Sequence, residues 1–286
     1  MAAYNHPGTA PILARVAKYI FPWVAPMIFN VVTLGMRNKR REPSLEALGR
    51  HGQYVRHMFI GDADPMEIVA EQLSSCPNVE NLALWTPRTL NENCLQVIKL
   101  LPLLRLYTYT TTIFNHNRHL GQQAKSLFPQ WKDLTHLTIY GSWSPAELHS
   151  CWRLLPKLQC LAFPVGHNLP SVFFNECPEL RMLLLLNDGF RDYEDDLYSP
   201  NDPRMVRLRL SNSVTDWKLG ARGGMDAWAH AEDRLEERAD KIEAWLLNQM
   251  SDSAELDRIL ERLRSGIPSP SRRRRRRLSS QPSQPS

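Results

Sequence analysis

A short apolar phrase that recurs along the chain is the feature that most constrains its fold. The phrase reads apolar-x-x-apolar-x-apolar, and its seven copies begin at Val55, Val79, Leu104, Leu134, Leu158, Leu180 and Met205. Successive starts are separated by 24, 25, 30, 24, 22 and 25 residues. Such a period, with a leucine-x-x-leucine-x-leucine core, is the signature of a leucine-rich repeat. Because one repeat buries its apolar face only against its neighbours, the pattern predicts a solenoid.

Each predicted unit combines a helix with a short strand. Alternation within the phrase places two apolar side chains on one face of the strand. The helical stretches end before Pro77, Pro102, Pro156 and Pro178, since proline cannot continue a helix. We therefore expect an α/β fold, a degenerate leucine-rich-repeat solenoid with parallel strands on its concave face and helices on its convex face. The 30-residue unit predicts an insertion at Phe114–Leu120, and the alternative is an unrelated α/β domain.

The composition of the chain changes at both ends, which divides it into four segments. We expect an N-terminal cap over residues 1–40, the repeat domain over 41–215, a helical cap over 216–265 and a disordered tail over 266–286. In the third segment the apolar residues fall on one helical stripe, namely Trp228, Ala231, Leu235, Ala239, Ile242, Trp245 and Leu246. The stripe favours a helix that covers the last repeat over a short dimeric coiled coil.

The concave face is the predicted partner-binding surface, because side chains between the buried strand positions point to it. The candidate contact residues are Trp85, Thr108, His136, Tyr140, Arg207 and Arg209. Exposed aromatic and arginine side chains dominate binding hot spots, which makes Trp85 and Tyr140 the best candidates. The alternative of equal weight is that Trp85 and Tyr140 fold over the edge of the repeats as core residues.

Charge and cysteine patterns favour a binding protein over an enzyme. The net charge of +5 comes from six consecutive arginines; without them 29 basic residues face 30 acidic ones, which leaves −1. The rest of the chain therefore gives no general reason to bind nucleic acid or an acidic membrane. The five cysteines form no C-x-x-C pair, and we expect them to be buried and reduced. His116 and His119 lack further metal ligands at a matching spacing, so we predict no metal site. No pattern of residues with the local signature of a catalytic site stands out either, so we predict no catalytic site and no cofactor.

The C-terminal tail consists of serine, proline, arginine and glutamine, a composition that cannot form a packed core. Its six consecutive arginines are the candidate nuclear import signal: Arg272, Arg273, Arg274, Arg275, Arg276 and Arg277. Ser279 follows them at the spacing of a basic-directed phosphorylation site. The alternative is a solvated tail that no receptor reads. These features predict a cytoplasmic or nuclear protein, in which only the arginine tail offers a contact for nucleic acid.

Two phrases at the ends of the repeats resemble a known family. Val16, Lys18, Trp23, Pro26, Ile28, Phe29, Val32 and Leu34 match the phrase that leads from a divergent F-box into the repeats of fungal F-box/leucine-rich-repeat proteins. The phrase that begins at Asp216-Trp217 and continues through Gly220, Asp226 and Trp228 is similar to the closing segment of that family. The resemblance covers residues 14–240.

The resemblance implies a substrate receptor of a cullin-type ubiquitin ligase. In such a receptor the F-box contacts the small adaptor subunit, and the repeats hold the protein to be ubiquitylated. Trp23 and Pro26 are then the adaptor-facing residues. Only 13 residues precede Ala14 and they contain no Leu-Pro-x-Glu phrase, so we expect a truncated F-box. The alternative function is a free-standing protein-interaction scaffold with no connection to ubiquitin, and neither alternative crosses a membrane.

Overall fold

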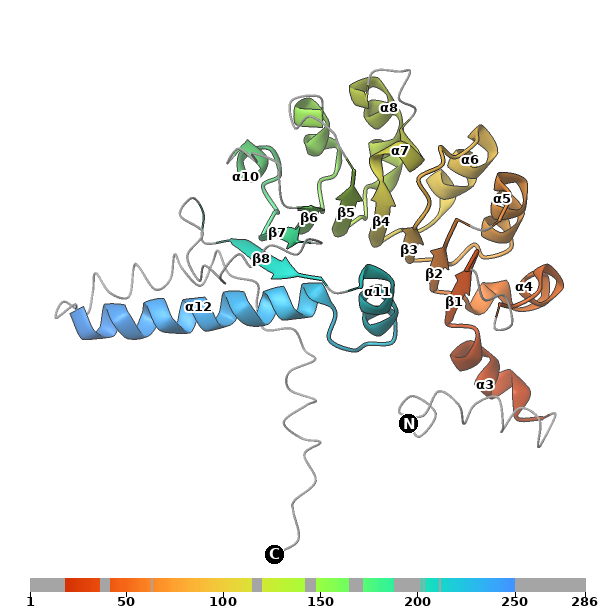
Figure 1. Cartoon of the computed structure of the whole chain (residues 1–286), viewed down its shortest axis with the longest axis horizontal. Helices are drawn as coiled ribbons and strands as arrows, with labels where there is room; N and C mark the ends of the chain where they lie inside the picture. Colours follow the sequence, from red (N-terminus) through yellow and green to blue (C-terminus); the bar gives the residue numbers. More distant parts are fainter. Residues whose placement is uncertain are drawn as a thin grey trace, which may run out of the picture.

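Eight short strands form one parallel sheet in which each strand pairs with its neighbours along the chain. The computed structural model describes residues 19–36, 42–62, 64–114, 120–141, 148–164, 172–187, 202, 204–210 and 212–249. The strands are β1 (Val31–Leu34), β2 (His57–Ile60), β3 (Asn81–Leu84), β4 (Arg105–Tyr109), β5 (His136–Tyr140), β6 (Cys160–Pro164), β7 (Met182–Asn187) and β8 (Met205–Arg209). The sheet is curved, with its strands on the inner side of an arc (Figure 1). The predicted α/β class is confirmed.

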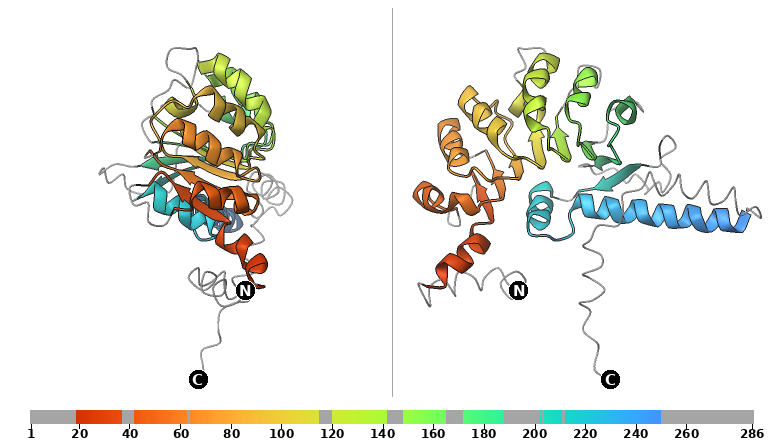
Figure 2. Two further views of the ribbon diagram at one scale, coloured as in Figure 1. Left: turned by 90° about the vertical axis from the view of Figure 1, so that its right-hand side faces the viewer. Right: turned by 180° about the vertical axis from the view of Figure 1, so that it is seen from behind.

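Helices connect the strands and cover the convex face of the sheet (Figures 1 and 2). They are α4 (Leu45–His51), α5 (Met66–Ser74), α6 (Glu92–Leu100), α7 (Thr110–Ile113), α8 (Leu120–Leu127) and α10 (Val172–Glu176), with 3-10 turns η2 (Gly52–Tyr54), η3 (Phe128–Trp131) and η4 (His149–Leu154). Polar side chains fix where helices begin: Ser44 and Asn91 accept hydrogen bonds from the backbone amides of Ala47 and Cys94. Parallel pairing requires the chain to return, between strands, to the end of the sheet at which the previous strand began.

The convex core consists of the apolar positions that the repeated phrase predicts. Leu82 and Leu84 of β3 align with Met58 and Ile60 of β2, and all four are fully buried beneath the helices. Five of the seven phrases follow this register. The prediction that the five cysteines are buried is also confirmed, and none of them forms a disulfide.

Two of the seven phrases were assigned to the wrong face of the sheet. In β4 it is Leu106 that aligns with Leu82, so Tyr107 and Tyr109 face the concave side and Thr108 faces the helices. In β8 Met205 aligns with Leu183, so Val206 and Leu208 face the concave side. A shift by one residue reverses every side chain of a strand. In β4 the error arose because apolar or aromatic residues stand on both faces of the strand. In β8 it arose because the alternating apolar residues Val206 and Leu208 pack on the concave side, away from the helices.

The N-terminal segment supplies the strand at one edge of the sheet. Helix α3 (Phe21–Ile28) precedes β1, which pairs with β2 along its full length. The imidazole ring of His51 lies 5.1 Å from the ring of Phe21 and 4.6 Å from the ring of Phe29. These ring contacts hold α3 against α4. The described part of this segment is thus a helix followed by the edge strand of the sheet.

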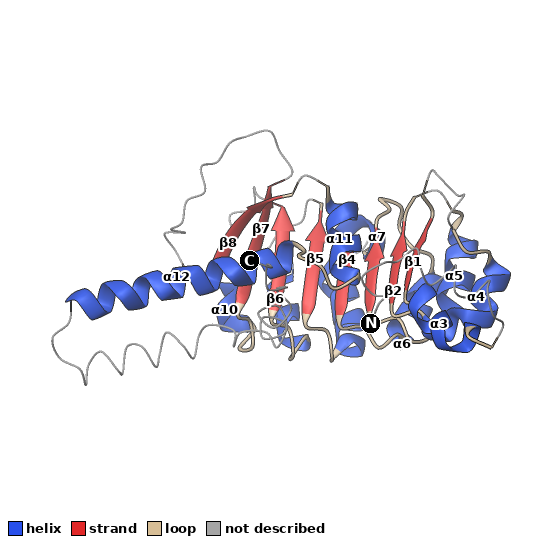
Figure 3. Cartoon of the chain, turned by 90° about the horizontal axis from the view of Figure 1, so that it is seen from below, coloured by secondary structure: helices blue, strands red, loops and turns tan. Residues whose placement is uncertain are grey.

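The C-terminal segment contacts the last strand, β8, and also covers the concave face of the sheet, which the sequence did not predict. Helix α11 (Ser213–Ala221) and the first turns of α12 (Ala227–Gln249) lie beneath the strands, and α12 then extends past β8 (Figures 1 and 3). Trp217, Trp228, Ala231 and Leu235 form a second core with the concave side chains of β2–β8. We call residues 213–235 the concave cover. Among the described residues, no helix combines the length and the apolar character that crossing a bilayer requires.

Candidate functional site

The six predicted contact residues do not share one face. Trp85 follows β3 and packs with the concave core, as do Tyr140 and, against Trp228, the ring of His136. Thr108 is fully buried on the helix-facing side of β4. By the same alternation, Arg207 and Arg209 stand on the helix-facing side of β8, where both are exposed. The predicted placement is thus right for three residues and wrong for Thr108, Arg207 and Arg209.

Trp85 and Tyr140 lie together at the carboxyl ends of β3 and β5. Their ring centroids are 4.9 Å apart, and Tyr109 lies 5.1 Å from Trp85. Tyr140 is only 2% exposed, and its hydroxyl donates a hydrogen bond to Ser213 Oγ of the concave cover at 3.3 Å. Trp85 is half-buried. Tyr140 is therefore a core residue, as one of the two predicted alternatives states, whereas Trp85 and Tyr109 form a partly accessible aromatic rim.

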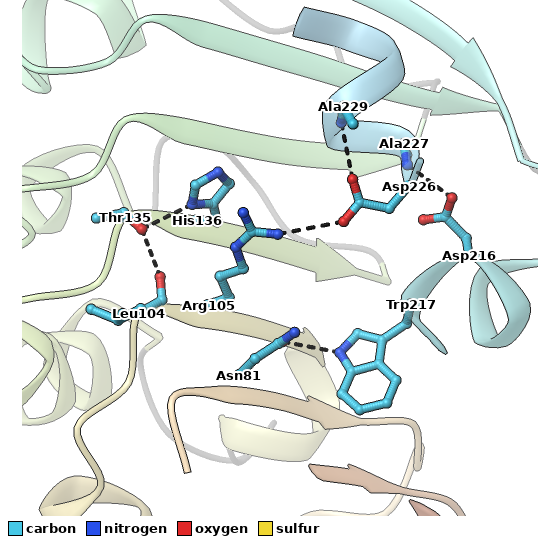
Figure 4. Close-up of polar contacts among 10 residues, drawn as sticks. All are labelled: Asn81, Leu104, Arg105, Thr135, His136, Asp216, Trp217, Asp226, Ala227 and Ala229. Carbon is cyan, nitrogen blue, oxygen red and sulfur yellow. Dashed lines mark hydrogen bonds and ion pairs between the residues drawn. The ribbon is translucent and has the colours of Figure 1, made fainter. Parts of the chain in front are cut away.

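Polar contacts fix the concave cover to the central strands (Figure 4). The indole Nε1 of Trp217 donates a hydrogen bond to Asn81 Oδ1 at 3.0 Å, and both residues are buried. The guanidinium of Arg105 lies 3.4 Å from the carboxylate of Asp226. Such bonds satisfy polar groups that the cover would otherwise bury without partners. They also set the register of the cover on β3 and β4.

Two aspartates control the turn between α11 and α12. Asp216 Oδ1 accepts a hydrogen bond from the amide of Ala227 at 2.8 Å, and Asp226 Oδ1 accepts one from the amide of Ala229 at 2.9 Å. A Cβ atom at position 220 would collide with the carboxylate of Asp226, so Gly220 permits the close approach. The cover is therefore held in place by both its own turn and the sheet.

Burial changes the titration of groups beneath the concave cover. Burial first, and then the neighbouring charge of Asp226, raise the pKa of Asp216 to about 7. Burial, aided by Asp226 and Asp216, also raises the pKa of Tyr107 well above its usual value. The Oδ2 atom of Asp216 is buried and has no hydrogen-bond partner among the described residues. Asp216 therefore gains and loses its proton near neutral pH, far above the range of an exposed aspartate.

Sequence reasoning missed the concave cover, although the sequence holds a signal for it. The concave positions of several strands are apolar, including Ala83, Ala162, Leu184 and Leu186. A solvated face of a sheet normally carries polar residues at alternate positions. A row of apolar residues on the face opposite the helices therefore indicates a second covering layer. Trp217 and Asp226 were noticed only as parts of a family phrase, and Trp228 also as the start of the apolar stripe of the C-terminal helix.

A second site lies at the N-terminal end, on the outer face of α3. Trp23 is 82% exposed, Tyr19 is 79% exposed, and Pro22 and Pro26 are exposed beside them. These positions fall on one side of a helix at three- and four-residue steps. The opposite side carries the buried residues Val24 and Ala25. Because tryptophan is usually buried, this exposed aromatic face marks a candidate binding surface.

The other candidate groups in the sequence were the cysteines, the possible metal ligands and the C-terminal tail. Burial raises the pKa of the thiols of Cys76, Cys160 and Cys177 to about 12, so they stay protonated at neutral pH. Within the described ranges no group of three or more histidine, cysteine, aspartate or glutamate side chains could hold a metal ion. His116, His119, the run Arg272–Arg277 and Ser279 lie outside the described residues.

Comparison with known proteins leaves the function to be argued from these surfaces. A scan against protein-family models finds no match to this chain, and a search of curated proteins finds none either.

Proposed function

We propose that this chain is a protein-binding leucine-rich-repeat domain that serves as a substrate receptor of a cullin-type ubiquitin ligase. In this proposal the outer face of α3 contacts the adaptor subunit of the ligase. The partner protein contacts the rest of the repeat domain, including the partly accessible rim formed by Trp85 and Tyr109. The observation that carries the proposal is the exposure of Trp23.

The outer face of α3 has the composition of a docking surface. Tyr19 and Trp23 supply rigid aromatic area that loses little conformational entropy on binding. Pro22 and Pro26 lie beside them and offer further apolar surface without an amide N–H to leave unpaired. The ring contacts of His51 with Phe21 and Phe29 hold the helix rigid behind this face. A preformed aromatic face of this kind suits a helix of a partner subunit.

The concave cover supports the family resemblance on independent grounds. The phrase that resembles the closing segment of fungal F-box/leucine-rich-repeat proteins contains Asp216, Trp217, Gly220, Asp226 and Trp228. Each of these residues has a defined role in fixing the cover to the sheet or in shaping its turn. The phrase is therefore a structural unit of the domain rather than a chance run of residues.

Trp23→Ala tests the proposal in a binding experiment with the purified adaptor subunit. We expect the wild-type chain to retain the adaptor on an affinity column and Trp23→Ala to lose most of that binding, since anchoring tryptophans cost about 2 kcal/mol or more on truncation. Pro26→Ala, which removes apolar surface from the same face of α3, should also weaken adaptor binding. The matched control is Leu100→Ala, because Leu100 is 85% exposed but lies on α6 at a distance from α3.

The free-standing scaffold predicts a different result. If the tagged chain captures other proteins from its own cells but neither it nor the purified chain binds the adaptor, the ligase assignment is wrong. Adaptor binding that survives Trp23→Ala would instead exclude the outer face of α3 as the docking surface.

A further inference from the structure

A cleft of about 420 Å³ lies on the convex side between α6 and α8. It arises from the one irregular step in the sheet. Equivalent positions of β3, β4, β5 and β6 are Asn81, Arg105, His136 and Cys160, so the step from β4 to β5 is 31 residues whereas its neighbours are 24. The longer step inserts α7 after β4. Helix α6 packs against α5 on one side but contacts η3, not α8, most extensively on the other.

The floor of the cleft is apolar and its rim is polar. Leu90, Ile113 and Leu127 are almost fully buried and form the floor together with Leu95. Gln122 and Ser126 stand on the rim, one helical turn apart on α8. Neither side chain has a hydrogen bond within the described part of the chain, so both are free to meet a ligand. A volume of this size is typical of sites for small ligands or short peptide segments.

The charged residues that line the cleft are one acid, Glu92, and one base, Lys99. The side chain of Lys99 is only 19% exposed, yet its one ion pair among the described residues is with Glu92 at 3.9 Å. That distance is too long for a hydrogen bond, and Glu92 itself is largely exposed and accepts a closer bond from Gln96 at 2.6 Å. An ammonium group has three donors, and those of Lys99 are not buried and make no hydrogen bond among the described residues, so they remain accessible from the cleft. An anion that enters the cleft can therefore pair with Lys99.

We propose that this cleft binds the carboxyl terminus of a partner polypeptide whose last residue is apolar. Lys99 pairs with the terminal carboxylate, and the last side chain enters the floor between Leu95, Ile113 and Leu127. Gln122 and Ser126 bond the peptide backbone. A terminal residue carries its carboxylate and side chain on one Cα atom, which fits a cleft in which the ammonium and the apolar floor are adjacent. The identity of the source as a partner protein rests on the proposed function, whereas the binding chemistry does not.

The test uses three short peptides and the full chain. Acetyl-glycyl-seryl-leucine with a free carboxylate is the probe; the same peptide with a C-terminal amide lacks the charge. Acetyl-glycyl-glutamyl-leucine amide places the charge and the apolar group on separate residues. Methyl NMR of Ile113, Leu95 and Leu127 reports occupancy. We expect saturable shifts with the free acid and binding about tenfold weaker for both amides, since a charge-assisted bond contributes about 1.5–3 kcal/mol.

Variants assign the binding to the cleft. Lys99→Met should weaken binding of the free-acid peptide about tenfold and abolish the preference of the cleft for the acid over the amide. Lys125→Met, at an exposed lysine of α8 outside the cleft, should change neither the affinity nor the preference. Glu92→Gln removes the carboxylate that competes for Lys99, at an exposed position, and should tighten binding of the free-acid peptide. The proposal would be overturned if the free acid produced no saturable shifts, or if the matching amide bound as tightly as the free acid. It would also be overturned if the glutamyl peptide bound as tightly as the free acid or more tightly. Failure of adaptor binding by the outer face of α3 would leave these outcomes unchanged.

Discussion

Asp216 is the single residue whose protonation most directly affects the concave cover. Its pKa of about 7 in the folded chain lies above the ordinary value of 3.8, so folding favours its neutral form. Between these two values unfolding releases a proton, and the contribution of Asp216 to the free energy of unfolding falls as the pH rises. Above about pH 7 the loss is complete. Arg105 and Tyr107 of β4, Tyr140 of β5 and Asp226 are the other titratable groups in this cluster.

Asp216→Asn should therefore stabilise the chain at pH 8. The asparagine Oδ1 still accepts from the amide of Ala227, and no charge is buried beside Asp226. We expect a gain on the order of 1–2 kcal/mol at pH 8, reduced from the full linkage value because Asp216 is only partly buried, and a gain near zero at pH 4. Urea unfolding at the two pH values measures it.

Asp233→Asn is the control for this effect, because Asp233 is an exposed acid on α12. It should shift the free energy of unfolding little at either pH. A gain from Asp216→Asn that is the same at pH 4 and pH 8 would contradict the assigned cause.

Among the elements, the concave cover decides whether the concave face is a binding surface or a core. Trp228 is 2% exposed and its ring lies 5.3 Å from His136 and 6.4 Å from Tyr107. Removal of a tryptophan side chain from a packed core costs about 3–5 kcal/mol. We expect Trp228→Ala to lower the free energy of unfolding by this amount, as measured by urea denaturation.

Trp23→Ala is the matched comparison, since it removes the same side chain from a position that is 82% exposed. Its effect on the free energy of unfolding should stay within about 0.5 kcal/mol. Similar small losses for both variants would mean that the cover is not part of the core, and the concave face would then be free for a partner.

The sequence predicted the elements better than their faces. The repeat period and the proline positions were sufficient to locate the helices and most of the strands, because the convex core needs apolar residues at fixed steps. In β4 the run from Leu103 to Tyr109 offers two apolar registers, and only the alignment of Leu106 with Leu82 decides between them. β1 was recognised only as part of a cap. The place of α11 and α12 depends on contacts such as Trp217 with Asn81, which are 136 residues apart and leave no periodic pattern.

At the level of the whole molecule, one sheet is shared by two apolar cores. The convex core joins the strands to the outer helices, and the concave core joins the same strands to the cover. Strands buried on both faces are typical of parallel sheets in α/β proteins. This arrangement explains why β3, β6 and most of β7 consist almost entirely of buried residues. It also means that loss of the cover exposes the middle of the sheet.

The cover should accordingly unfold together with the sheet. Native-state hydrogen exchange separates elements that open alone from those that open only with the whole chain. We expect amides of α11 and of the first two turns of α12 to exchange with the same free energy as those of β4 and β5. Their opening would leave Tyr107, Leu184 and the ring of Trp217 in water, which costs about 25 cal/mol for each Å² of apolar surface. Amides of the cover that exchange orders of magnitude faster than β4, with β4 still protected, would instead identify the cover as a lid that opens by itself.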